Sequence, residues 1–211
     1  MGLRERKKEQ TRRRIAEVAL RLFDERGYDA VTVNEIAEAA GVAKVTLFNY
    51  FQTKDCLVTE GVKEGLAAIV AGRGEGRSPL QALREHYRSM AAQGAGEVDV
   101  EALLARVRVI SSSPALMGAL HAMHMSERYE LAEALGQACP GDDLTARLMA
   151  GQITAAVTTV QEAFFHRIAT GEPLEEAGRR LADDVELAFD LLEHGLTHAK
   201  KGINHEKGDQ L

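Results

Sequence analysis

Basic side chains are concentrated at the start of the chain, where they could bind phosphate groups. Among the first 14 residues, seven Lys and Arg side chains stand against two Glu carboxylates, a local balance of +5. The whole chain of 211 residues has a formal net charge of −6, so the remainder is acidic. Because phosphate neutralisation supplies most non-specific affinity for nucleic acids, this distribution favours a polyanion-binding amino-terminal end. A solvated helix end would be the simpler explanation if nothing further followed the run.

A second group of side chains, within residues 44–54, is of the types that contact bases and phosphates. Hydroxyl, amide and ammonium groups hydrogen-bond to base edges or phosphate oxygens, and apolar groups contact the thymine methyl group. The apolar pattern predicts a short helix with Leu47 and Phe51 facing inward. Near its end, Tyr50 and Lys54 are placed for phosphates. The residues expected to face a groove are Lys44, Val45, Thr46, Phe48 and Asn49.

Two preceding helices must hold this segment in place. Apolar residues recur at helical spacing from Ile15 to Phe23, and Gly27 supplies the stop. Thr32 and Glu35 form a capping box that begins a second, short helix. That helix ends at Gly41, just before the segment described above. Two short helices joined by a tight turn, behind a longer one, predict a helix-turn-helix whose last helix enters a major groove.

A dense and colinear set of motifs runs from Arg12 to Val58. It comprises "RLFDERGY" at the end of the first helix, Thr32 before the second, "IAEAAGV" across the turn and "TLFNYFQTKDCLV" beyond it. In these motifs, which cover the first quarter or so of the chain, the sequence resembles the DNA-binding head of the TetR family of bacterial transcriptional regulators. The resemblance implies an all-α protein with an amino-terminal helix-turn-helix head and a helical body for ligand binding and dimerisation.

The resemblance also implies roles for individual residues of the head. Base contacts are implied for Lys44, Val45, Thr46 and Phe48. Phosphate contacts are implied for Thr32, Asn49, Tyr50 and Lys54, with Asn34 as an extra. One position departs from many relatives: Ala43 stands where they carry a Ser that caps the recognition helix. Loss of that hydroxyl should cost the cap about 1 kcal/mol, and it leaves open that the head has lost its operator function.

The rest of the chain reads as helices separated by prolines and glycine-rich loops. The four prolines, at 79, 114, 140 and 173, each stand at a plausible break. Six helices are predicted near 54–71, 79–93, 98–111, 114–137, 143–169 and 174–199, the first of them capped by Thr53. With the head, that makes nine. The predicted organisation is a DNA-binding domain over 1–55, a ligand-binding and dimerisation domain over 56–199, and a disordered tail over 200–211.

The two long helices near 143–169 and 174–199 are candidates for a homodimer interface. The first carries a broad apolar face from Met149 to Ile168, and the second carries another from Leu181 to Leu196. A stripe wider than one core contact favours a second partner, as in a four-helix bundle formed with a second copy. A two-fold dimer would also read a palindromic double-stranded DNA operator. The alternative is that both faces belong to the core of one chain.

The middle of the body holds adaptable and polar-aromatic side chains suited to a small-molecule site. Methionine fits irregular shapes, and such sites are largely apolar with a few polar groups. In TetR relatives a pocket in the body binds an inducer, so the resemblance implies an unidentified small-molecule inducer here. The residues predicted to line the pocket are Met90, Met117, His121, Met125, Tyr129 and Phe165. Ordinary core packing explains many of them equally well.

Other functional classes find little support in the sequence. His121 and His124, three apart, could share one face of a helix and bind copper or zinc, so a metal-sensing regulator is the alternative function. No third ligand stands at a matching position, so no metal site is assigned. No catalytic or cofactor motif is present, which predicts a protein that is not an enzyme and needs no cofactor. The absence of an apolar span or secretory signal predicts a cytoplasmic protein with no membrane partner.

Overall fold

The computed structural model describes residues 2–59, 65–93, 99–138 and 142–195. Every regular element within these ranges is an α-helix, which confirms the predicted all-α class. The described ranges hold ten helices, one more than the sequence predicts. They are α1 (Leu3–Arg26), α2 (Val33–Ala39), α3 (Lys44–Phe48), α4 (Cys56–Thr59), α5 (Leu66–Ala71), α6 (Pro79–Gln93), α7 (Val100–Ser112), α8 (Pro114–Ala138), α9 (Asp143–Ala169) and α10 (Leu174–His194).

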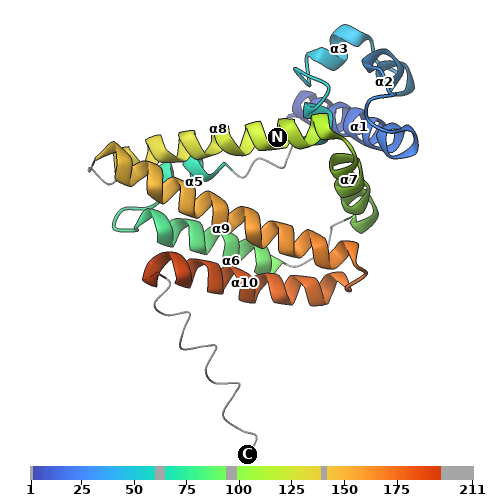
Figure 1. The fold of residues 1–211 in the computed structure, drawn as a ribbon. Coiled ribbons are helices and arrows are strands. Elements are labelled where there is room, and N and C mark those ends of the chain that lie inside the picture. The colour runs from blue at the N-terminus through green and yellow to red at the C-terminus, as the bar shows by residue number, and fades with distance from the viewer. Residues whose placement is uncertain (1, 60–64, 94–98, 139–141, 196–211) are drawn as a thin grey trace, which may run out of the picture. The chain divides into compact units, whose positions relative to one another are not determined.

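The chain divides into two compact units (Figure 1). The first unit holds residues 1–64 and 98–123, and the second holds residues 65–97 and 124–211. Residues 98–123, which the sequence analysis placed in the body, thus group with the head, because α7 packs against α1. The predicted tail at 200–211 lies outside the described residues.

The core of the first unit is built from the apolar faces that helical spacing predicts. Ile15, Ala19 and Phe23 of α1 are 0–1% exposed, and Ile36 and Leu47 contribute fully buried side chains from α2 and α3. α1 is longer than the apolar pattern indicates, because the basic run from residue 3 onward is also helical. The basic side chains of that run are therefore spaced on a helix rather than on an extended arm.

One carboxylate joins the end of α1 to the start of α2. Glu35 accepts a hydrogen bond from the backbone N–H of Thr32 at 2.8 Å, while the Thr32 hydroxyl accepts from the backbone N–H of Glu35 at 3.3 Å, so the predicted capping box is confirmed. The guanidinium of Arg26 donates to the same carboxylate at 2.7 Å. The carboxylate also accepts from the Thr32 hydroxyl at 2.7 Å. The bonds that it accepts from the Thr32 backbone, the Thr32 hydroxyl and Arg26 lower the pKa of Glu35 to about 2, the backbone bond from Thr32 being the largest cause.

α7 completes the first unit. Asp99 caps the helix by accepting from the backbone N–H of Ala102 at 3.0 Å. Val109 of α7 and Leu116 of α8 are buried in the same cluster as the α1 core. Arg108 donates to both carboxylate oxygens of Asp24, at 3.1 and 2.8 Å, a bidentate pair that fixes α7 to α1.

The single helix predicted over 54–71 is wrong. α4 begins at Cys56 rather than at a Thr53 cap, and α5 begins at Leu66 after Gly65, whose φ of 67° is in the left-handed region. Residues 60–64 of the predicted helix lie outside the described residues. A glycine at positive φ ends helical geometry at little steric cost, so Gly65 marks the break that hydrophobic spacing alone did not reveal.

The second unit packs α6, α9 and α10 side by side (Figure 1). Its buried cluster includes Tyr87 of α6, Ile153 and Val157 of α9, and Phe189 of α10. The rings of Tyr87 and Phe189 lie 6.0 Å apart between centroids. The cluster also takes in Leu131 and Leu135 of α8 and two α5 residues.

The broad apolar faces predicted to need a second copy belong mainly to this intrachain core. Ile153, Val157, Val160 and Ile168 of α9 are at most 9% exposed, and Val185 of α10 is 2% exposed. The width of the stripe therefore does not by itself require a partner, because α9 packs against several elements of its own chain. Leu196, the last member of the second face, lies outside the described residues.

An ion-pair network fastens α6 to α10. Arg84 donates to Glu186 at 2.5 Å, to Asp190 at 2.6 Å and to Glu193 at 3.2 Å, and its own side chain is only 18% exposed. Arg88 donates to the same Glu186 carboxylate. The two guanidinium groups lower the pKa of Glu186 to about 2, the hydrogen bond from Arg88 being the largest cause.

The described part of α10 ends earlier than predicted, at His194, where Gly195 adopts a φ of 69°. None of the described helices is long and apolar enough to cross a membrane alone. α7 and α8 have the length and hydropathy of a membrane span only when they are taken together, and the chain bends by 101° at their junction.

Candidate functional site

The short helix α3 presents an apolar and polar surface to solvent. Leu47 is completely buried, and Phe51 just beyond the helix is 1% exposed, as predicted. Val45, by contrast, is 73% exposed and Phe48 is 42% exposed, and Lys44 and Asn49 are exposed beside them. Thr46 is half-buried. Four of the five residues expected to face a groove are thus exposed, and the DNA contacts of all five stay a prediction.

The start of α3 has no side-chain cap. Ala43 occupies the cap position with φ −69° and ψ 147°, and no side-chain hydrogen bond is made there. Because the backbone conformation is that of an ordinary N-cap, a hydroxyl at this position would point at the free N–H groups of the first turn. The missing serine therefore leaves the α3 start dependent on water or on a bound phosphate.

The two candidates at the start of α2 differ in their surroundings. The Thr32 hydroxyl donates to the Glu35 carboxylate at 2.7 Å, so it already serves the capping box. Its exposed position still allows the oxygen to accept a further contact. Asn34 is exposed in the first turn of α2. Both lie at a helix amino terminus, where the helix dipole favours an anion.

Lys54 is directed into the head rather than into solvent. Its ammonium donates to the backbone carbonyl of Tyr28 at 2.5 Å and lies 4.1 Å from the centroid of the Tyr28 ring and 5.5 Å from that of Phe23. Burial lowers the pKa of Lys54 below its usual value. Its phosphate contact remains a prediction, but Lys54 also has a structural role that the sequence did not reveal. Tyr50, the second phosphate candidate in this segment, is half-buried.

The basic run at the chain start lies along the first turns of α1. Arg4, Arg6, Lys7 and Lys8 are exposed, as are Arg13 and Arg14. The Arg12 guanidinium lies 5.5 Å from the centroid of the Phe51 ring, which places one cation of the run against the segment that follows α3.

The six predicted inducer contacts fall in different units. Met117 and His121 belong to the first unit, and Met90, Met125, Tyr129 and Phe165 belong to the second. Met90 and Met117 are each 48% exposed, Tyr129 is 56% exposed, and Phe165 lies edge to face with Phe164 at 5.6 Å. The structure defines each unit by itself, so the predicted inducer site stays a prediction.

A groove of about 280 Å³ lies between α8 and α9 of the second unit. Arg128, Tyr129, Ala132 and Arg147 line it. The Arg128 guanidinium lies 5.4 Å from the centroid of the Tyr129 ring, and Arg147 pairs with Asp143 at 3.3 Å. Tyr129 is among the predicted inducer contacts. The two arginines are not, because nothing in their spacing distinguishes them from ordinary surface charges.

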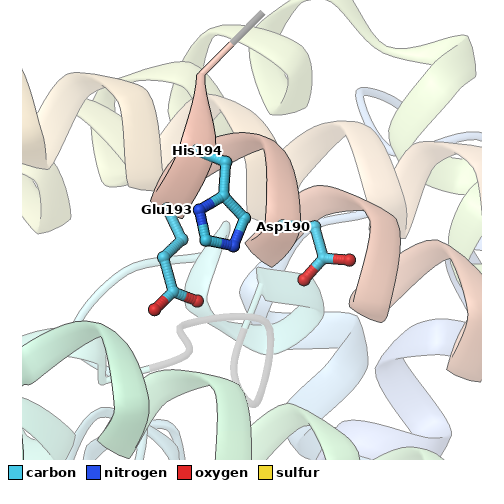
Figure 2. A group of neighbouring side chains, drawn as sticks. All are labelled: Asp190, Glu193 and His194. Carbon is cyan, nitrogen blue, oxygen red and sulfur yellow. The ribbon is translucent and has the colours of Figure 1, made fainter. Parts of the chain in front are cut away.

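Among the described residues, no third metal ligand joins His121 and His124. Within the described ranges, the one group that could hold an ion is Asp190, Glu193 and His194, at the end of α10 (Figure 2). All three are exposed, and Arg84 already neutralises the two carboxylates. A metal ion would have to displace the Arg84 guanidinium from both carboxylates. Asp190 and Glu193 therefore belong primarily to the ion-pair network between α6 and α10.

Comparison with known proteins matches both parts of the chain. The profile of the bacterial regulatory proteins of the tetR family matches residues 15–60, and that of the MftR C-terminal domain matches residues 77–197. TcmR of Streptomyces glaucescens, an HTH-type transcriptional regulator, is 33% identical over 123 residues, which are 55% of this chain and 54% of TcmR. MftR of Mycobacterium tuberculosis is 29% identical over 138 residues, which are 64% of this chain and 69% of MftR.

Two solved structures share the fold. SmeT in complex with triclosan is 19% identical with a TM-score of 0.54, over 87% of this chain and 90% of SmeT. GusR of Salmonella enterica is 20% identical with a TM-score of 0.53, over 89% of this chain and 96% of GusR. The profile of the tetR family matches the helix-turn-helix, and the MftR C-terminal profile matches more than half of the chain. The chain therefore belongs to the TetR family of bacterial regulatory proteins.

Proposed function

We propose that the protein is a homodimeric repressor that binds a palindromic operator and is released from it by a small-molecule inducer. Each head would place α3 in a major groove, and the body would hold the inducer. Release is a population shift, because the inducer lowers operator affinity only if it prefers a conformation that the operator disfavours. SmeT, which shares the fold, was solved with the small molecule triclosan.

The observation that carries the DNA-binding part is the exposure of Val45 and Phe48 on α3. α3 has five residues and buries Leu47, but it leaves two large apolar side chains in water. These two side chains add little burial energy to the folding of the head itself. In a major groove the same side chains would contact thymine methyl groups, while Lys44 and Thr46 would reach base edges. Phosphate contacts would come from Thr32, Asn34, Asn49, Tyr50 and Lys54.

The exposed side of α9 supports the dimer. Leu144 and Leu148 are 61% and 58% exposed, although the apolar face of the same helix fills the core. No charged residue occurs from Leu148 to Gln161. The solvent side of this stretch therefore holds only uncharged side chains, with the small residues Ala155 and Thr159 following Leu148 and Gln152. Leu187 of α10 is 59% exposed as well. An uncharged face of this kind is typical of packing against a second copy.

Quantitative gel shift with DNA from around the protein's own gene tests the proposal. Specific binding should fall steeply with salt, because phosphate contacts release counterions. Thr46→Ala and Lys44→Ala should relax the preference for the best site over mutated sites. Arg179→Ala is the control, since it removes an exposed arginine of α10 that pairs with Glu176. Absence of salt-sensitive binding to any such fragment would overturn the proposal.

A further inference from the structure

Arg106 of α7 has no counter-charge among the residues that the structure describes. Its side chain is half-buried, and its Nε is inaccessible to solvent and has no hydrogen-bond partner within the described part of the chain. A guanidinium stays protonated in proteins, so a positive charge is here partly removed from water. Buried charges are normally paired, because taking an isolated ion out of water is costly.

Nothing on the same helix compensates for this charge. The residues three and four positions away are Ala102, Leu103, Val109 and Ile110, all of them apolar. Intrahelical carboxylates at these spacings are the usual partners of a helical arginine. The α7 side chains that flank Arg106 are therefore uncharged; Ala102, Val109 and Ile110 among them pack in the core of the first unit, whereas Leu103 is not part of that cluster.

Arg108, two residues further on, shows the contrast. It pairs with both oxygens of Asp24, and that hydrogen bond raises the pKa of Arg108. Arg84 and Arg167 are likewise held by carboxylates that raise their pKa values. For Arg106 burial lowers the pKa, and no neighbouring charge opposes the effect. Arg106 thus lacks the partner that these other arginines have.

We propose that Arg106 binds the acidic group of the inducer, and that the inducer is an amphipathic small molecule with a carboxylate on an apolar body. The apolar body would lie against the aliphatic side chain of Leu103, and the carboxylate would supply the acceptor that the Arg106 guanidinium lacks. The inference rests on the proposed function, since it names the ligand class of the regulator.

Calorimetric titration of the full-length protein with octanoate and with octan-1-ol tests the inference. The two probes share an apolar chain and differ in charge. The unmutated protein should prefer octanoate, and Arg106→Met should weaken octanoate binding about tenfold or more while leaving octan-1-ol unchanged. Arg108→Met is the matched control on the same helix and should keep the preference. Arg106→Lys, which retains a charge, should keep part of it.

Thermal unfolding without any ligand gives a second, independent readout. Because Arg106→Met removes an uncompensated charge, it should leave the Tm unchanged or raise it, whereas Arg108→Met should lower it slightly. Equal affinity of the unmutated protein for the two probes, no octanoate binding, or an octanoate preference that survives in Arg106→Met would each overturn the inference. Operator binding in the gel shift is measured separately, so failure of either idea leaves the other standing.

Discussion

The buried carboxylate of Glu127 in α8 accepts a hydrogen bond from the backbone N–H of Gly65, 62 residues away in sequence, at 2.8 Å. It also accepts from the backbone N–H of Leu66 at 3.4 Å. These two N–H groups lie at the start of α5. The cap residue Gly65 has no side chain that could accept a hydrogen bond from them. Glu127, only 2% exposed, therefore supplies from a distant helix the cap that α5 lacks.

Glu127→Ala should destabilise the second unit by about 1–3 kcal/mol, because it leaves buried backbone donors unsatisfied. Glu127→Gln keeps a carbonyl acceptor and should lose less. Urea unfolding followed by circular dichroism measures both. Glu133→Gln, an exposed position of the same helix, is the control and should change little. Equal effects of the substitutions at 127 and 133 would contradict the capping role.

The stability of the head should depend on pH through Glu35. Its pKa is about 2 in the folded protein against a usual 4.5, so the charged form is favoured by folding. The contribution is therefore complete above about pH 4.5 and is lost as the pH falls toward 2. The Tm difference between the unmutated protein and Glu35→Gln should shrink over that window. A difference that stays constant down to pH 2 would argue against the assigned hydrogen bonds.

Lys54→Ala should weaken DNA binding to all sequences alike and should also lower the stability of the head. The structural loss, about 0.5–2 kcal/mol, arises from the bond to the Tyr28 carbonyl and the contact with its ring. Lys44→Ala removes an exposed lysine of α3 and should leave stability unchanged. Denaturant titrations of the two variants, run beside salt-dependent gel shifts, separate folding from binding. A Lys54→Ala protein as stable as Lys44→Ala would refute the structural role.

Ala43→Ser should gain function. The position has N-cap geometry and no cap bond, so a hydroxyl there should stabilise the protein by about 0.5–2 kcal/mol and tighten operator binding. Ala39→Ser makes the same exchange at an exposed position inside α2, where serine is a poorer helix former, and should be slightly destabilising. Tm and operator affinity check both variants. Identical changes from the two exchanges would show that the cap plays no part.

Leu148→Lys should convert the proposed dimer into a monomer, because it places a charge on the uncharged, exposed side of α9. Sedimentation velocity measures the change. Met90→Lys adds the same charge at an exposed methionine of α6 and should leave the dimer intact. Persistence of a dimer in the Leu148 variant would move the interface elsewhere.

The head could be predicted from sequence because its signals are local. The Thr32–Glu35 capping box and the alternation of Leu47 with exposed neighbours each depend on residues a few positions apart. The inward orientation of Lys54 could not be predicted in this way. Its partner Tyr28 is 26 residues away, and a lysine near a recognition helix has the same sequence signature whether it faces DNA or the core.

The body was predicted less completely because its contacts are long-range. The break before α5 depends on Glu127, and the attachment of α7 to the head depends on Asp24, which is 84 residues from Arg108. The apolar stripe of α9 was recognised, but periodicity reports only that a face is apolar. It does not report whether the same chain or a second copy covers that face, and here Ile153 and Val157 pack within the chain.

The bidentate pair between Arg108 and Asp24 connects α7 to the helices that present α3. Arg108 of α7 binds Asp24 of α1, and Arg26 of α1 in turn binds Glu35 of α2. An exposed ion pair contributes only about 0–1 kcal/mol, so this contact sets direction more than stability. Val109 of α7 is buried in the same cluster as Phe23 of α1 and Leu47 of α3, and this packing carries the stability of the connection. The support of the exposed α3 surface therefore includes a helix from the middle of the chain, beyond the amino-terminal helices that form the helix-turn-helix.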